Sequence, residues 1–253
     1  CGEKKTTRVK YSDMMIRKKT GAANRKVQKL MNLMNMETVH VAWDFLKENG
    51  LKALILKSKH KIQGIDDDYD YAEWWNLTKP SEEELEAQKK ETFEYMPKFS
   101  IVIPVYKTPE KFLKEMLDSI VEQTYANWEL CIADGSPAGE SVENVLKKDA
   151  RIRYQVLGEN RGISGNTNAA LEMAEGDFIV LADHDDRLTP NALFECAKKL
   201  NENENCDVLY SDEDKLDMDG DELFDPHFKP DFNPDLLTSV NYICHLFVVK
   251  KEL

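Results

Sequence analysis

The stretch FIVLADHDD, residues 178–186, decides how this chain is interpreted. Its first five residues are typical of a strand that is buried on both faces, and four polar residues follow at once. Mg²⁺ and Mn²⁺ prefer oxygen ligands and complete their shell with water and substrate phosphates. Asp183 and Asp185, which flank one residue, therefore predict a divalent metal site. A solvated acidic turn, or a cap on the following helix, is the alternative interpretation.

The segments around this stretch alternate between strand and helix patterns. Apolar runs predict strands at residues 99–106, 128–133, 152–157 and 208–210, and helical patterns predict helices at 108–121, 142–148, 168–174 and 190–203. This order predicts an α/β domain with a mostly parallel sheet and helices on both faces. Open sheets of this kind bind ligands beside the carboxyl ends of their strands.

Charge is distributed unevenly along the 253 residues. Residues 1–61 hold 15 Lys and Arg against 5 Asp and Glu, a balance of +10, whereas the remainder has a balance of −23. We expect a basic, mainly helical N-terminal region and linker over residues 1–97, followed by the α/β domain over 98–253. A basic arm suits peripheral contact with an anionic membrane surface or an acidic partner, although lysines that solvate a helical bundle would give the same pattern. Nucleic acid is not an expected partner, because the α/β domain is strongly acidic.

Two further observations predict a cytoplasmic protein, at the inner face of the membrane if the basic arm binds there. No apolar run approaches the roughly 18 residues of a membrane span, and no signal peptide pattern is present. The five cysteines are odd in number, scattered, and never spaced as C-x-x-C, which favours reduced thiols.

In the linker, PSEEE at residues 80–84 predicts a capped helix that runs to about Tyr95.

Four predicted loops follow the carboxyl ends of strands and should converge on one crevice. They contain Pro104-Val105-Tyr106, then Asp134-Gly135-Ser136, then Asn160-Arg161-Gly162 with Asn166 and Asn168, and finally the aspartate run. An acid can accept hydrogen bonds from a ribose or base, an arginine can pair with phosphate, and a metal can bridge a diphosphate. This outline predicts a nucleotide-sugar site, and neither G-x-G-x-x-G nor Walker A is present to favour another nucleotide fold.

At these positions the chain resembles glycosyltransferase family 2, which has the GT-A (Rossmann-like) fold. The matching stretches span about residues 98–195: Ser100 to Tyr106, Gln123 to Tyr125, Trp128 to Leu130, Asp134 to Ser136, Asn168 to Gly176, and Asp183 to Asp186 with Leu188 and Pro190. Later segments, and the linker Trp74 to Met96, resemble the branch that builds bacterial surface polysaccharides, rhamnosyltransferase-like members included. These later segments are Tyr210 to Lys215, Phe228 to Asp231 and Asn241 to Leu246.

The resemblance implies a role for several side chains. Pro104, Val105 and Tyr106 would line the nucleoside pocket, and Asp134 would hold the base. Arg161 and Asn168 would face the donor, Arg161 at the diphosphate. Asp183 would approach the ribose or sugar, and Asp185 would bind Mn²⁺ or Mg²⁺. Asp186 is a weaker candidate, and His184 and His245 are not expected to be ligands.

The implied reaction is metal-dependent, inverting transfer of a sugar from a nucleoside diphosphate to a saccharide or lipid-linked saccharide acceptor. Asp212, Glu213 and Asp214 are weak candidates for the base, because family members place an acidic motif beyond a segment like Val248 to Lys250. The sequence would then be truncated before its last catalytic segment. A non-catalytic nucleotide-sugar-binding module remains an alternative. A haloacid-dehalogenase-type phosphatase fits less well, since that family places its aspartate motif after the first strand.

Overall fold

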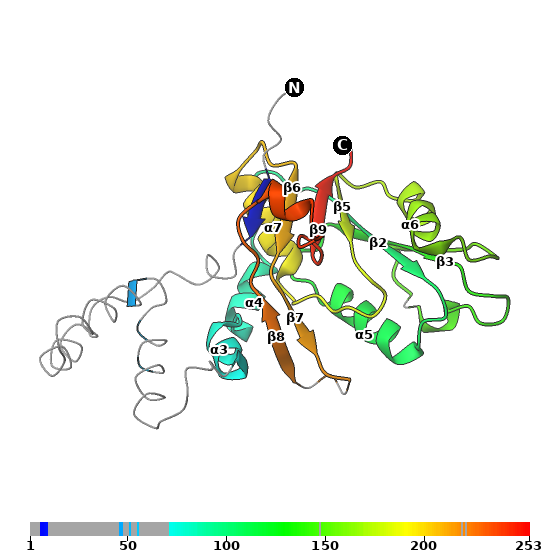
Figure 1. The fold of residues 1–253 in the computed structure, drawn as a ribbon, viewed down its shortest axis with the longest axis horizontal. Helices are drawn as coiled ribbons and strands as arrows, with labels where there is room; N and C mark the ends of the chain where they lie inside the picture. Colours follow the sequence, from blue (N-terminus) through cyan, green and yellow to red (C-terminus); the bar gives the residue numbers. More distant parts are fainter. Residues whose placement is uncertain are drawn as a thin grey trace, which may run out of the picture. The chain divides into compact units, whose positions relative to one another are not determined.

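The computed structural model describes residues 6–9, 46–47, 51, 55, 71–146, 148–218, 220 and 222–253 (Figure 1). Most of the basic N-terminal region lies outside the described residues, so its predicted helices and its membrane contact stay predictions. The chain forms two compact units. The first comprises Cys1–Val9, Pro80–Glu213 and His227–Leu253, and the second comprises Lys10–Lys79 and Asp214–Pro226. The predicted boundary after residue 97 stays a prediction.

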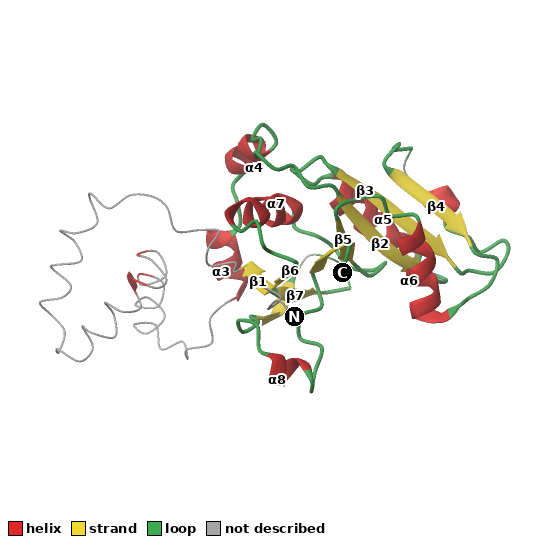
Figure 2. Ribbon diagram, turned by 90° about the horizontal axis from the view of Figure 1, so that it is seen from above, coloured by secondary structure: helices red, strands yellow, loops and turns green. Residues whose placement is uncertain are grey.

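The first unit is built on one sheet with the strand order β1-β6-β9-β5-β2-β3-β4 (Figures 1 and 2). Its strands are β1 (Thr6–Val9), β2 (Phe99–Val105), β3 (Trp128–Asp134), β4 (Ile152–Val156), β5 (Phe178–Leu181), β6 (Val208–Ser211) and β9 (Phe247–Lys250). Strands β5, β2, β3 and β4 are parallel neighbours, and β1 is parallel to β6. Strand β9 is antiparallel to both of its neighbours, β5 and β6. The expected mostly parallel α/β sheet is confirmed.

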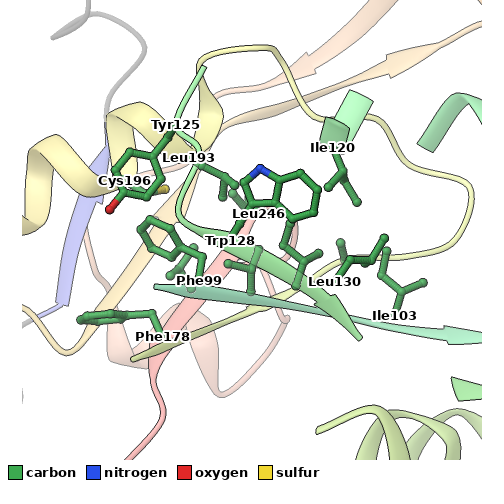
Figure 3. Close-up of a cluster of buried hydrophobic side chains, with 14 of the residues drawn as sticks. Phe99, Ile103, Ile120, Tyr125, Trp128, Leu130, Phe178, Leu193, Cys196 and Leu246 are labelled. Atoms are coloured by element: carbon green, nitrogen blue, oxygen red, sulfur yellow. The ribbon is translucent and has the colours of Figure 1, made fainter. Parts of the chain in front are cut away.

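Helices cover both faces of the central strands. The helices are α4 (Glu82–Gln88), α5 (Glu110–Val121), α6 (Gly162–Glu172), α7 (Ala192–Glu202) and the short α8 (Pro234–Leu237). Side chains alternate along β2, so that Ile101 and Ile103 belong to the larger core with α5 and α7, while Val102 belongs to a smaller core with α6. Figure 3 shows part of the larger core, which includes Trp128, Leu130 and Leu246.

Several predicted elements differ in length from the observed ones. The capping box that begins α4 is present, since Ser81 Oγ accepts the Glu84 N–H and the Glu84 carboxylate accepts the Ser81 N–H, but the helix ends at Gln88 instead of about Tyr95. Helix α6 begins at Gly162, well before the predicted start at Asn168. The helix predicted at 142–148 is a single 3₁₀ turn, Glu143–Val145. Turn residues at these ends blur the helical period, which explains why the sequence placed the boundaries poorly.

A buried polar network ties the beginnings of β2 and β3 to the loop before β5. The Glu129 carboxylate accepts hydrogen bonds from Ser100 Oγ at 2.6 Å, Lys98 Nζ at 2.7 Å and the Glu175 backbone N–H at 2.5 Å. Burial alone would raise the pKa of Glu129, but these hydrogen bonds outweigh burial and lower the pKa to about 2. The carboxylate is therefore charged and satisfied inside the protein, at the sheet edge opposite the carboxyl ends.

The second unit contains helix α3 (Tyr71–Thr78) and a hairpin of β7 (Glu213–Leu216) and β8 (Leu223–His227). The Tyr71 hydroxyl donates to Asp214 Oδ2 at 2.6 Å, and Tyr71 stacks on Trp74 with ring centroids 5.5 Å apart. These contacts join the helix to the hairpin. Across the described parts of the chain, every helix is too short or too polar to cross a membrane.

Candidate functional site at the carboxyl edge of the sheet

The loops after β2, β3 and β4 begin at one level of the sheet. The Gly135 N–H donates to the Val105 carbonyl at 2.9 Å, and the Leu157 N–H donates to the Asp134 carbonyl at 2.8 Å. These bonds continue the strand ladder into the loops, so the polar residues that follow each strand emerge at the same edge. Neighbouring strands lie about 5 Å apart, so a ligand as large as a nucleotide can contact the loops of several strands at once.

Asp134, at the end of β3, is fully buried and organises its own loop. Its carboxylate accepts hydrogen bonds from the Ser136 N–H at 2.8 Å, the Val142 N–H at 3.1 Å and the Tyr154 hydroxyl at 2.6 Å. Burial favours the neutral acid, but the bonds from Ser136, Tyr154 and Val142 prevail and lower the pKa of Asp134. Both oxygens already have protein partners, and the role of holding a base stays a prediction.

Ser136 joins the loops that follow β2 and β3. Its buried hydroxyl accepts a hydrogen bond at 2.8 Å from the backbone N–H of Lys107, a residue with φ of +51°. That left-handed conformation is uncommon outside glycine and needs such a contact to hold it. Tyr106, directly before it, is 42% exposed, and the Lys107 ammonium lies 5.8 Å from its ring centroid. Tyr106 thus presents an accessible ring at this edge, and its place in a nucleoside pocket stays a prediction.

The loop after β4 packs on Gly135 through Asn166. Asn166 is buried on α6, and its Oδ1 accepts the Arg161 N–H at 3.0 Å. A Cβ added at Gly135 would lie 2.7 Å from Asn166 Nδ2 and 3.1 Å from the Asn160 Cα, so a side chain at this position would displace Asn166. Arg161 and Asn168 are exposed. Arg161 pairs with Glu159 at 3.4 Å. Arg161 and Asn168 remain candidates for donor binding.

The aspartate run after β5 meets a histidine from the segment before β9. His245 Nε2 lies 3.3 Å from Asp183 Oδ2, and His245 Nδ1 lies 4.0 Å from Asp186 Oδ2. One ligand atom from each of these three residues lies within 4.8 Å of the others. We call Asp183, Asp186 and His245 the strand-end triad. Asp185 is exposed and its carboxylate lies 3.5 Å from His184 Nδ1, so the structure brings Asp186, and not Asp185, close to Asp183 and His245.

The donor set of the strand-end triad fits a divalent cation. Two carboxylates and one imidazole are ligands that Mn²⁺ and related ions accept, with room left for water or phosphate oxygens. Burial, followed by repulsion from Asp183, Asp185 and Glu213, raises the pKa of Asp186 against the lowering effect of His245. His245 Nδ1 is buried and has no hydrogen-bond partner. A cation would relieve both the repulsion and the unsatisfied nitrogen.

The three acids predicted as candidate bases have partners within the protein. Asp212 Oδ1 accepts the Lys229 N–H at 2.7 Å, and Glu213 Oε2 accepts the His245 N–H at 2.7 Å. Glu213 Oε1 also lies 3.0 Å from His227 Nδ1. Asp214 belongs to the second unit, where it binds Tyr71. Their catalytic role stays a prediction.

The structure places His245 and Asp186 beside Asp183, although the sequence did not predict that these three residues lie together. His245 stands beside an apolar strand, a setting in which most histidines are core residues. The available signal was the H-L-F-V-V-K run itself, residues 245–250, because a strand there would place its leading residue beside another strand end. Asn166 was predicted to lie at this edge, but Tyr154, which donates to Asp134, carries no local motif.

Several known proteins are similar to this chain. The family model for glycosyl transferase family 2 matches residues 100–252. The chain is 42% identical over 161 residues to an uncharacterized protein, y4gI, of Sinorhizobium fredii, covering 62% of this chain and 18% of that protein. It is 33% identical over 187 residues to the O-antigen biosynthesis protein RfbC of Myxococcus xanthus, and the match covers 72% of this chain and 15% of that protein.

A third relative is named for a defined transfer reaction. This is the GalNAc(5)-diNAcBac-PP-undecaprenol beta-1,3-glucosyltransferase of Campylobacter jejuni, 33% identical over 112 residues, which are 42% of this chain and 36% of that protein. The chain therefore spans well under half of the length of each of these three relatives.

Proposed function

Because this chain belongs to glycosyltransferase family 2, we propose that it transfers a sugar from a nucleoside diphosphate donor to a saccharide or lipid-linked saccharide acceptor, with a divalent cation. The family match begins at the second residue of β2 and covers β3, β4, β5, β6, β9 and the strand-end triad. The convergence of Asp183, Asp186 and His245 at the carboxyl end of β5 is the single observation that carries the cation dependence.

The acceptor class is proposed from the relatives. One relative is named for O-antigen biosynthesis and another for glucosyl transfer to an undecaprenol-linked saccharide. The first name describes saccharide assembly, and the second describes a lipid-linked acceptor. We extend this class to the present chain as a proposal, together with contact at a membrane surface where such an acceptor would reside.

In this proposal, each group of residues in the site has its own role. Tyr106, Pro104 and Val105 receive the nucleoside, and the loop held by Asp134 and Asn166 shapes that pocket. Arg161 and Asn168 face the donor, and the aspartate run from Asp183 to Asp186, with Asp185 included, surrounds the diphosphate. A bound cation would neutralise the departing diphosphate, a large electrostatic contribution in transfer reactions of this kind. The candidates for the base that takes the acceptor proton are Asp212, Glu213 and Asp214.

Titration calorimetry with a panel of nucleoside diphosphates, with and without Mn²⁺, tests the donor side of the proposal. We expect one diphosphate to bind at micromolar to millimolar Kd and at least tenfold more weakly without the cation. Failure of every diphosphate to bind, or equal binding without metal, would contradict the proposal.

A transfer assay separates catalysis from binding alone. The chain is incubated with the donor that binds, Mn²⁺ and lipid-linked saccharide acceptors, and release of nucleoside diphosphate is measured. An enzyme releases diphosphate faster when an acceptor is present. Tight donor binding without any release, for every acceptor, would instead indicate the nucleotide-sugar-binding module.

A further inference from the structure

We propose that His245 is a nitrogen ligand of the cation, together with Asp183 and Asp186, and that Glu213 and the buried Lys229 are positioning residues that hold His245 in place. The inference deepens the proposed function and rests on its cation dependence. It assigns the third ligand to a residue outside the aspartate run, and it predicts that Asp186 contributes more than Asp185 does.

The register of the sheet places His245 opposite Asp183. Strand β9 pairs antiparallel with β5, and Leu181 is the partner of Phe247. Asp183 and His245 each lie two residues beyond this last pair, so the pairing brings the two segments that carry them together. The observed Nε2 to Oδ2 distance of 3.3 Å agrees with this register. Strand pairing therefore brings the two segments together, and contacts to the His245 backbone fix the residue beside Asp183.

The surroundings of His245 leave its ring nitrogens available to a ligand. Within the described residues, the ring contacts Asp183 and Asp186, and its buried Nδ1 has no hydrogen-bond partner. A histidine that served only packing would satisfy a buried ring nitrogen with a backbone or side-chain partner. An imidazole between two carboxylates, with one nitrogen unsatisfied, suits coordination of a cation better.

Lys229 holds the backbone of His245 by a hydrogen bond to its carbonyl. The Lys229 side chain is fully buried, and its Nζ donates to the His245 carbonyl at 2.6 Å and lies 3.6 Å from Glu213 Oε2. Glu213 Oε2 in turn accepts the His245 N–H at 2.7 Å. Both polar groups of the His245 backbone are thus held by the ion pair of buried Lys229 and partly exposed Glu213. Isolated burial of an ammonium is costly, and here the carboxylate and the carbonyl compensate for it.

An imidazole ligand changes which ion the site prefers. Mg²⁺ prefers oxygen ligands almost exclusively, whereas Mn²⁺ and the later transition ions accept imidazole more readily. We therefore expect Mn²⁺ to bind more tightly than Mg²⁺, and His245→Gln to reduce that preference. Removal of one ligand or of its supporting group commonly lowers metal affinity by about 10-fold to 100-fold.

Electron paramagnetic resonance of Mn²⁺ bound to the full 253-residue chain tests the assignment without any activity assay. The electron spin-echo modulation of bound Mn²⁺ should show coupling to an imidazole nitrogen. That coupling should vanish in His245→Gln, and Mn²⁺ affinity should fall about 10-fold or more. Asp186→Asn should weaken binding similarly, while Asp185→Asn should change it by less than about threefold, on the same ligand-loss scale.

Lys229→Met and Glu213→Ala test the positioning residues by the same measurement. Both should lower Mn²⁺ affinity and weaken the nitrogen coupling. Lys251→Met is a matched control, because Lys251 Nζ also donates to a backbone carbonyl, that of Ala174, at 2.6 Å. It should leave the Mn²⁺ spectrum unchanged. If Lys229→Met does not fold, Glu213→Ala alone decides, since Glu213 is partly exposed and tolerates truncation better.

The possible outcomes distinguish this inference from the function beneath it. Bound Mn²⁺ without nitrogen coupling would overturn the His245 assignment and leave the cation-dependent function intact. Unchanged coupling in both Lys229→Met and Glu213→Ala would overturn the positioning roles alone. No Mn²⁺ binding, even with the nucleoside diphosphates added, would overturn both the inference and the cation dependence.

Discussion

Replacing Glu129 by Gln should destabilise the protein by about 3 kcal/mol at pH 7. The Glu129 side chain is 3% exposed, and its carboxylate joins Lys98, Ser100 and the Glu175 backbone at the start of β2 and β3. Gln keeps the shape but not the charge, so the hydrogen bonds from Lys98 and from the backbone lose their charge assistance. The network around β2 and β3 is thereby weakened without opening a cavity.

The magnitude follows from the pKa of Glu129. Its ordinary value is 4.5 and the folded value is about 2, a difference equivalent to about 3 kcal/mol at about 1.4 kcal/mol per pKa unit. Because the folded pKa is the lower one, the stabilisation is complete above about pH 5 and is lost as the pH falls toward 2. About 2 kcal/mol of it should already be lost at pH 3, by the same linkage relation.

Urea unfolding of the wild-type protein and of Glu129→Gln, followed by circular dichroism at pH 7 and pH 3, measures this effect. The difference in the free energy of unfolding between the two proteins should shrink as the pH falls. Glu86→Gln is the control, since Glu86 pairs with Lys89 on the surface and should show little change at either pH. A difference that is absent at pH 7, or that is the same at both pH values, would refute the reasoning.

Three further predictions concern the carboxyl edge of the sheet. Tyr154→Phe removes one hydrogen bond to Asp134; it should cost about 1–2 kcal/mol in urea unfolding and, because the bond lowers the pKa of Asp134, move the acid unfolding transition to higher pH. Gly135→Ala should displace Asn166 and weaken nucleoside diphosphate binding about tenfold in calorimetry, while circular dichroism stays unchanged, and wild-type affinity would contradict this. Asp183→Asn should reduce sugar transfer by about 100-fold or more, and chelation of the wild-type protein should do the same until Mn²⁺ is restored; a rate that survives both treatments would exclude the cation.

The order of strands and helices could be predicted from the sequence because it is encoded locally. The run at residues 99–105 is apolar at nearly every position, as a strand covered on both faces must be, and the helical stripe of α5 repeats at three and four residues. The element ends were less accurate, as at α4 and at the 3₁₀ turn Glu143–Val145, because capping and turn residues serve several conformations.

The candidate site could be predicted only in part. Some of its residues follow directly on a strand, whereas others are placed by contacts between segments that are distant in the sequence. The aspartate run and Tyr106 follow directly on their strands, so a local pattern is enough to place them at one edge. Asp134 was also placed at that edge, but the sequence did not show that Ser136, Val142 and Tyr154 occupy its oxygens. These partners come from separate segments, and no spacing rule links them to Asp134.

The contribution of His245 depends on pairing that is distant in the chain. Had β9 run parallel to β5, its leading residue would lie at the opposite edge of the sheet, far from Asp183. The antiparallel direction and the register of Leu181 with Phe247 together bring His245 to the aspartates. Strand pairing alone does not fix a residue just beyond the ladder, and here Glu213 and Lys229 hold its N–H and carbonyl. A methionine of similar volume would avoid the desolvation cost of the Lys229 ammonium, so the buried charge is best explained by the peptide that it fixes.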